Sequence, residues 1–235
     1  MQTVSDIRDQ FAEKLLRQEF VGNTIEIIGA TFLVDSPVIF GELNDEWSKR
    51  ELKWYESISL NVNDIEGNIP KIWKDVATPD GFINSNYGWA IWSEANGAQY
   101  CNVLQKLQAD RNSRQGQMIY TRPSMHNDWN EGGKKDFMCT AYNQMFIRDN
   151  MLHSHYVMRS NDSIFGFKGD VYWAQEVHRR MAKDLGIGIG DLIWTSSSQH
   201  IYDRHFYLVA HYIKTGQVSI SKENFAAFYP NSKYL

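Results

Sequence analysis

Residues 137–170 read FMCTAYNQMFIRDNMLHSHYVMRSNDSIFGFKGD, and the order of patterns in this stretch decides the fold. Residues 137–147 and 151–159 are mainly apolar and aromatic, which is typical of strands. Residues 148–150 have the composition of a hairpin turn. The stretch therefore predicts two strands joined by a tight turn, followed by a segment that leads away from the second strand.

A helix is predicted from about Asp170 to Leu185. Trp173, Val177 and Met181 repeat at helical spacing within it, so they form its inward side. Gly186 follows as the residue that closes the helix.

The rest of the chain adds strands and helices in mixed order. The expected strands are residues 24–34, 117–121 and 191–196, and the expected helices are residues 5–18, 43–58, 100–107 and 203–215. Ser5 is the expected N-cap of the first helix, and Gly216 ends the last one. Because strands and helices do not alternate strictly, the class is α+β or mixed α/β, and not a doubly wound parallel sheet.

Composition limits what the chain can bind. The 235 residues are 43% hydrophobic and 14% aromatic, and no Pro- or Gly-rich linker or charge run divides them, so we expect one domain over residues 1–235. A formal net charge of −4 argues against nucleic acid as the ligand, because that affinity needs clustered Lys and Arg. Two cysteines without a secretory leader or a long apolar stretch indicate a cytoplasmic protein that does not enter the membrane.

Glu51 is an anomaly in the predicted helix 43–58. At about 100° per residue, one apolar stripe of this helix holds Leu43, Trp47, Trp54 and Ile58. Glu51 lies at the centre of that stripe. It is either a desolvated carboxylate suited to proton transfer near neutral pH or an ordinary residue at an exposed edge, and the pattern leaves both interpretations open.

Cys139 falls on the predicted strand 137–147. A free cysteine in a strand is more often a small buried apolar residue than a nucleophile. A nearby arginine would favour the thiolate at neutral pH and hence a nucleophilic role. Cys101, beside the apolar stripe of its helix, carries no such argument and is interpreted as structural.

The seven histidines raise the question of a metal site. The chain has no Cys-x-x-Cys or His-Glu-x-x-His spacing, so we expect no metal. It also lacks a Walker loop and a dinucleotide glycine fingerprint. Any phosphate must therefore be held by side chains, and arginine has the best geometry for it.

Asp170 opens the predicted helix just after Gly169. The ordinary interpretation of an acidic residue in this place is an N-cap. A residue at a helix N-terminus can also face a ligand, so the two roles are compatible.

Several motifs in register resemble thymidylate synthases. In that family a cysteine nucleophile precedes an Arg-Ser-x-Asp phosphate and folate motif and then a His-x-Tyr sugar motif. The corresponding segments here are Cys139, RSNDSIFGFKGD (159–170) and SSQHIYDRH (197–205). Upstream agreement comes from RELKWY around Glu51, KIW at Trp73, NYGWAIW at Tyr87 and NSRQG at Arg114. Each piece is weak alone, but together they cover most of the chain.

Within that superfamily the sequence resembles the deoxycytidylate hydroxymethylases of T-even phages. The shared stretches are TIEIIGA, SNYGWAIWSE, IYTRPSM, DFMCT, MRSND and RHFYLV. The resemblance implies the mixed sheet-and-helix fold of thymidylate synthase and a homodimer, with sheets packed back to back and active sites shared between subunits. It also implies that dCMP, 5,10-methylenetetrahydrofolate and water become 5-hydroxymethyl-dCMP and tetrahydrofolate, for phage DNA made in the host cytoplasm.

The resemblance assigns roles to single residues. Cys139 is implied as the nucleophile that adds to C6 of the pyrimidine, and Glu51 as the carboxylate that manages protons and water. The nucleotide-binding residues that it implies are Arg159 and Ser160 for the phosphate, Arg114 from the other subunit, and His200 and Tyr202 for the deoxyribose hydroxyl. The implied folate-binding residues are Trp73, Asp162 and Gly166.

The chain departs from the thymidylate synthase pattern in four places. Thr140 follows the nucleophile where histidine is common, and Asp170 replaces the asparagine that contacts the uracil edge; both changes favour a hydroxymethylase. Gln115 follows Arg114 where a second arginine is usual, which weakens the expected phosphate clamp. The early-loop arginine of the family has no clear counterpart, and Arg17 is a provisional choice.

Other functions stay open. The nearest alternative is a dUMP hydroxymethylase or a thymidylate synthase on the same fold, and only the methylation reaction forms dihydrofolate. A different class is a silent component of a phage nucleotide-synthesis complex, or an RNA-binding repressor. The intact set of Cys139, Glu51 and Arg159 argues against a silent protein, and the acidic pI argues against RNA.

Overall fold

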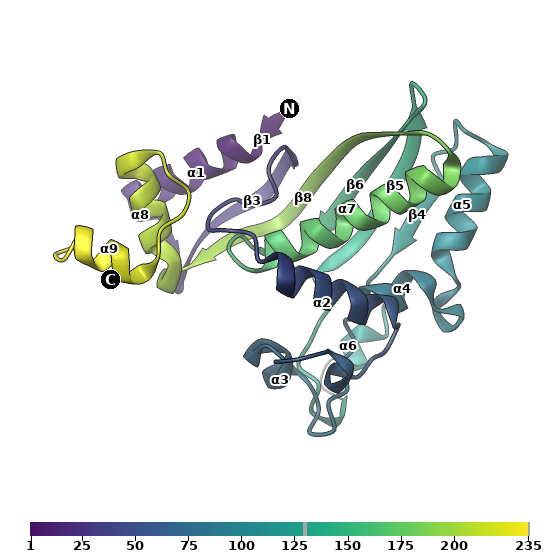
Figure 1. The fold of residues 1–235 in the computed structure, drawn as a ribbon, viewed down its shortest axis with the longest axis horizontal. Helices are drawn as coiled ribbons and strands as arrows, with labels where there is room; N and C mark the ends of the chain where they lie inside the picture. The colour runs from purple at the N-terminus through teal and green to yellow at the C-terminus, as the bar shows by residue number, and fades with distance from the viewer. Residues whose placement is uncertain (129–130, 235) are drawn as a thin grey trace. The chain divides into compact units, whose positions relative to one another are not determined.

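A computed structural model describes residues 1–128 and 131–234 (Figure 1). The chain divides into two units. Unit 1 comprises Met1–Leu43, Val157–Gln175 and Asp191–Leu235, and unit 2 comprises Asn44–Tyr156 and Glu176–Gly190.

The sheet of unit 1 is built around β3 (Thr24–Leu33), the β-branched stretch expected to form a strand. The strands paired with it are β1 (Gln2–Thr3), parallel, and β2 (Phe20–Val21) and β8 (Gly188–Tyr202), both antiparallel. The short strand β7 (Asn161–Asp162) runs parallel to the end of β8. In this sheet Glu26 lies opposite His200, and Ile27 opposite Gln199.

Unit 1 also contains helices. These are α1 (Val4–Arg17), the first part of α7 (Gly166–Leu185), α8 (Phe206–Thr215) and α9 (Lys222–Phe228). α1 packs against β3 and α8 through a fully buried stripe that includes Ile7, Phe11 and Leu15. Its N-cap is Thr3, in a capping box with Asp6, so the expectation of Ser5 is wrong.

Unit 2 contains β4 (Gly116–Ile119), β5 (Thr140–Arg148) and most of β6 (Met151–Met158), with β5 between the other two. The turn between β5 and β6 is the one expected, since Asp149 and Asn150 both adopt positive φ. The helices are α2 (Asp45–Glu56), α3 (Lys71–Val76), α4 (Tyr87–Trp92), α5 (Gln99–Ala109) and α6 (Met125–Asp128).

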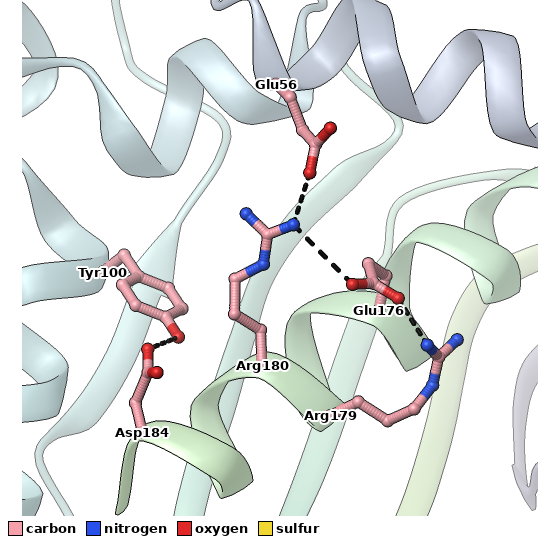
Figure 2. Close-up of polar contacts among 6 residues, drawn as sticks. All are labelled: Glu56, Tyr100, Glu176, Arg179, Arg180 and Asp184. Atoms are coloured by element: carbon pink, nitrogen blue, oxygen red, sulfur yellow. Dashed lines mark hydrogen bonds and ion pairs between the residues drawn. The ribbon is translucent and has the colours of Figure 1, made fainter.

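A polar cluster connects three helices of unit 2 (Figure 2). The Arg180 guanidinium on α7 pairs with Glu56 at the end of α2 and lies 3.6 Å from Glu176. On α5, the Tyr100 hydroxyl donates to Asp184 at 2.7 Å. Burial and this carboxylate raise the pKa of Tyr100 well above its ordinary value, so it remains a neutral donor. The cluster fixes α2, which carries Glu51, against α7.

Several boundaries differ from expectation. β5 begins at Thr140 rather than at residue 137, and α7 begins at Gly166 rather than near residue 170. β8 is much longer than residues 191–196, and α3, α4, α6 and α9 were not expected. Among the described residues, no helix is long and apolar enough to cross a bilayer.

Candidate active site

The pairing of β7 with β8 brings the Arg-Ser-x-Asp and His-x-Tyr motifs together in unit 1. Asn161 lies opposite Gln199, and Asp162 opposite His200. The backbone N–H of Ser163 extends the pairing by donating to the carbonyl of His200 at 2.8 Å. Two motifs far apart in the sequence therefore form one surface.

The Asp162 side chain binds backbone N–H groups just before α7. Its carboxylate accepts from the backbone N–H groups of Ile164 at 3.0 Å and Phe165 at 3.3 Å. These donors lie just before Gly166, the first residue of the helix. The interpretation of Asp170 as an N-cap is therefore wrong, because Asp170 is already inside the helix.

The Asp170 carboxylate is held by a chain of buried amides. Asn161 Nδ2 donates to Asp170 Oδ2 at 2.7 Å. Gln199 Nε2 donates to Asn161 Oδ1 at 3.1 Å and to Ser163 Oγ at 2.8 Å. The sequence analysis missed Asn161 and Gln199. Their only signal was an amide residue inside each motif, and nothing short of the β7–β8 register shows that they meet.

His200 and Tyr202 extend this surface along β8. They are two residues apart on one strand, so they share a face, and their rings meet edge to face with centroids 5.1 Å apart. His200 is buried and Tyr202 half-buried. Arg159 is exposed after β6, and Ser160 is half-buried. Unit 1 thus presents a cation, a hydroxyl group, an imidazole and a phenol, which are suited to a nucleotide.

Glu51 is buried in α2, so the interpretation as an ordinary residue at an exposed edge is wrong, and its role in proton transfer stays a prediction. It shares its face with Ser48, Trp54 and Tyr55. The apolar stripe is shorter than expected, because the helix ends at Glu56 and Ile58 is 40% exposed. Trp73 on α3 is half-buried and meets Trp54 edge to face, with centroids 5.2 Å apart.

Gly88 lets α4 approach α2 closely. A Cβ at this position would lie 1.8 Å from the backbone oxygen of Tyr55. Only glycine fits so tight a contact between backbones. The glycine of the NYGWAIW motif therefore helps to place the helix that carries Glu51.

Cys139 is half-buried one residue before β5, rather than on the strand itself. Its Sγ lies 4.0 Å from the carbonyl oxygen of Phe137. Asp136 anchors the segment before it, because its carboxylate accepts from the backbone N–H of Asn84 at 2.6 Å. Burial raises the pKa of this carboxyl group. Cys101, in contrast, is exposed on α5.

Arg114 is exposed in the loop before β4. It lines a cavity of about 330 Å³ together with Gln144, Phe146 and Arg148 of β5. Gln115 beside it is also exposed. Arg17 does not lie in a loop, since it occupies the last turn of α1 and pairs with Glu13 at 3.4 Å; the provisional choice is thus wrong.

The described residues contain no group of three or more His, Cys, Asp or Glu side chains placed to hold a metal ion. His205 is buried, and this burial lowers its pKa. Its ring packs edge to face on Phe165, with centroids 5.0 Å apart.

The sequence model of the thymidylate synthase family matches residues 43–226. The chain is 49% identical over 239 residues to the deoxycytidylate 5-hydroxymethyltransferase of Enterobacteria phage T4, and the match covers 97% of each chain. It is also 49% identical over 235 residues to the enzyme of the same name from Enterobacteria phage T6, covering 95% of this chain and 96% of the relative.

A solved structure confirms the expected fold. The thermostable thymidylate synthase A of Bacillus subtilis matches with a TM-score of 0.69 at 19% identity. The match covers 88% of this chain and 84% of that one. The mixed sheet with flanking helices is the thymidylate synthase fold.

Proposed function

The chain belongs to the thymidylate synthase family, and on that premise we propose that it is a deoxycytidylate 5-hydroxymethyltransferase. The observation that carries the proposal is the 49% identity, over nearly the whole chain, to phage enzymes of that name. The acidic residue at position 170 supports it, because cytosine offers an amino group for a carboxylate to bind. We treat residues 1–235 as one catalytic domain.

The chemistry follows from the weakness of C5 of cytosine as a nucleophile. We assign Cys139 to attack C6, which gives C5 enamine character. Enzymes of the family use methylenetetrahydrofolate as co-substrate, and here it would supply the one-carbon unit to C5. Loss of the C5 proton and of tetrahydrofolate leaves an exocyclic methylene group, which water attacks before the Cys139 thiolate departs.

Glu51 is assigned to proton and water management in this sequence. It is buried among aromatic side chains, where a carboxylate is desolvated and can exchange protons with substrate or water. Thymidylate synthase would instead transfer a hydride from the folate to the methylene group. Water attack keeps the folate at the tetrahydrofolate level.

Nucleotide binding is assigned to residues whose chemistry suits each part of dCMP. Arg159 and Ser160 bind the phosphate, because a guanidinium matches its geometry and a hydroxyl adds a donor. His200 and Tyr202 hold the deoxyribose hydroxyl, and Asp170 contacts the N3–C4 edge of the base. Asp170 is thus assigned to both substrate binding and catalysis.

The folate would be held by Trp73, Asp162 and Gly166. The residue types fit, since a half-buried indole can stack on a pterin ring and a carboxylate can accept from its N–H groups. A Cβ at Gly166 would approach Asp162 Cβ no closer than 3.4 Å, so packing within the chain does not require glycine here. A ligand that approaches the backbone closely would explain why position 166 is a glycine.

Family enzymes act as dimers, and we propose a homodimer in which Arg114 enters the partner's site. In unit 2, Gln144, Phe146 and Arg148 lie on the half-buried face of β5, and Phe146 stacks on His153 with centroids 5.9 Å apart. In unit 1, Ile28 of β3 is 73% exposed. Apolar side chains on an uncovered sheet face are suited to a subunit interface. We place the enzyme in the host cytoplasm.

The test is incubation with dCMP or dUMP and methylenetetrahydrofolate, followed by mass analysis of nucleotide and folate. The proposal expects 5-hydroxymethyl-dCMP and tetrahydrofolate. A thymidylate synthase would instead give a methylated nucleotide and dihydrofolate, and a dUMP hydroxymethylase would leave dCMP unchanged. A protein that converts neither nucleotide would support the silent or RNA-binding alternatives.

A further inference from the structure

Behind Asp170 lies a pair of buried amide side chains that no step of the proposed reaction uses directly. Asn161 is 2% exposed and Gln199 is fully buried. They are fixed opposite one another by the parallel pairing of β7 with β8. Their hydrogen bonds run in sequence from Gln199 to Asn161 and from Asn161 to Asp170.

The chemistry of the amide group determines the direction of these hydrogen bonds. An amide group has one acceptor end and one donor end, so each link constrains the next. Gln199 donates to the oxygen of Asn161, which leaves the Asn161 NH₂ group directed at Asp170. Turning Asn161 around would set its oxygen against the Asp170 carboxylate and its NH₂ group against the Gln199 NH₂ group. An ionised Asp170 and the two amides therefore support the same arrangement.

We propose that Asn161 and Gln199 are positioning residues that keep Asp170 ionised and thereby set the preference for cytosine over uracil. This inference rests on the proposed function. A donor to a carboxylate stabilises its charged form, and a buried donor does so strongly. Ionised Asp170 accepts from the cytosine amino group. Uracil presents an oxygen at that place, which only a protonated Asp170 could bind.

The Gln199–Ser163 hydrogen bond explains how a buried amide holds this direction. Gln199 Nε2 has two hydrogens, and both have acceptors in Asn161 Oδ1 and Ser163 Oγ. Among the described residues, Gln199 Oε1 has no hydrogen-bond partner. Two bonds on the nitrogen and none on the oxygen leave the Gln199 amide with one favoured orientation.

The experiment compares kcat/KM for dCMP and dUMP in Asn161→Leu and Gln199→Met. Asn161→Leu removes the donor to Asp170, so the dCMP/dUMP ratio should fall about tenfold or more, the scale of a hydrogen bond to a charged group. Gln199→Met keeps the donor but releases its orientation, so the ratio should fall less. Gln10→Met on α1, another amide with a buried nitrogen, is the matched control and should keep the wild-type ratio.

A second comparison separates this role from simple packing. In an Asp170→Asn background there is no charge to maintain, so adding Asn161→Leu should leave the ratio within about twofold. A packing defect would lower turnover of both nucleotides equally in either background. Unchanged ratios in folded Asn161→Leu and Gln199→Met, or an equal fall in the Asp170→Asn background, would overturn the inference.

Calorimetric binding of dCMP and dUMP without folate repeats the comparison independently of turnover. If wild type makes no 5-hydroxymethyl-dCMP, the proposed function fails. The ratio of dissociation constants in wild type and Asn161→Leu then still decides whether the amide pair acts through Asp170.

Discussion

At the scale of single residues, the proposed reaction assigns the covalent step to Cys139. It lies half-buried just before β5, and its Sγ is 4.0 Å from the carbonyl oxygen of Phe137. Cys139→Ser should lose nearly all turnover and still bind dCMP, because a hydroxyl group is a far weaker nucleophile than a thiolate. Steady-state rates check the loss of turnover, and calorimetry checks the binding of dCMP. The exposed Cys101→Ser is the control and should stay active; a Cys139→Ser enzyme within a few-fold of wild type contradicts the covalent mechanism.

We propose that Asp170 decides the choice between cytosine and uracil. Because it lies inside α7 and not at its N-cap, replacing it does not remove a helix cap. Asp170→Asn should lower kcat/KM for dCMP and raise relative activity on dUMP, since an amide can donate to O4 and accept from N3–H. A mismatched hydrogen bond at such a site can cost several powers of ten in specificity. An unchanged dCMP/dUMP ratio would remove the specificity role.

The sequence indicated candidate residues for the site but did not reveal their environments. Glu51 stood out because it interrupts an apolar stripe, yet only the packing of α2 showed that it is buried. Asp170 was expected to cap α7, but it lies inside the helix, and the Asp162 side chain accepts from the backbone N–H groups before it. Asn161 and Gln199 escaped notice, since contacts between distant strands depend on register.

At the scale of elements, the polar cluster around Arg180 holds α2 against α7 (Figure 2). The Arg180 guanidinium also lies 5.1 Å from the Trp92 ring centroid. Glu56→Gln and Arg180→Met should each lower the free energy of unfolding by about 1 kcal/mol, because the pair is partly exposed and solvent screens it. Urea unfolding of the double variant should show less than the sum of the two losses.

Arg179→Met is the matched control for that prediction. Arg179 sits beside Arg180 on α7, is 50% exposed and pairs with Glu176 alone among the described ion pairs. Its loss should change stability little. Strict additivity of Glu56→Gln and Arg180→Met would mean that the two residues do not stabilise the fold through each other.

Long periodic elements followed from the sequence, and short ones did not. α1, β3, α5 and the hairpin of β5 and β6 carry clear hydrophobic patterns, and all were predicted. α3 and α4 have six residues each, too few for a periodic signal. α7 starts early because the Asp162 side chain supplies acceptors before it, which hydrophobic periodicity cannot reveal.

At the scale of the whole molecule, the proposed homodimer has a direct test. If Arg114 acts in the partner's site, Arg114→Ala and Cys139→Ala should each turn over poorly alone. Mixed and re-equilibrated, they should regain up to about one competent site per heterodimer, as two-fold symmetry requires. Native mass spectrometry must confirm subunit exchange. Exchange without rescue would place Arg114 and Cys139 of one subunit in the same site, or Arg114 in none.

In the proposed reaction, water and not a hydride attacks the exocyclic methylene group. Turnover of dCMP and methylenetetrahydrofolate in ¹⁸O-labelled water tests it most directly, with mass analysis of nucleotide and folate. The account predicts a 5-hydroxymethyl-dCMP whose new hydroxyl group carries the label, and tetrahydrofolate as the other product. A methylated nucleotide with dihydrofolate, or a hydroxymethyl product without the label, would contradict it.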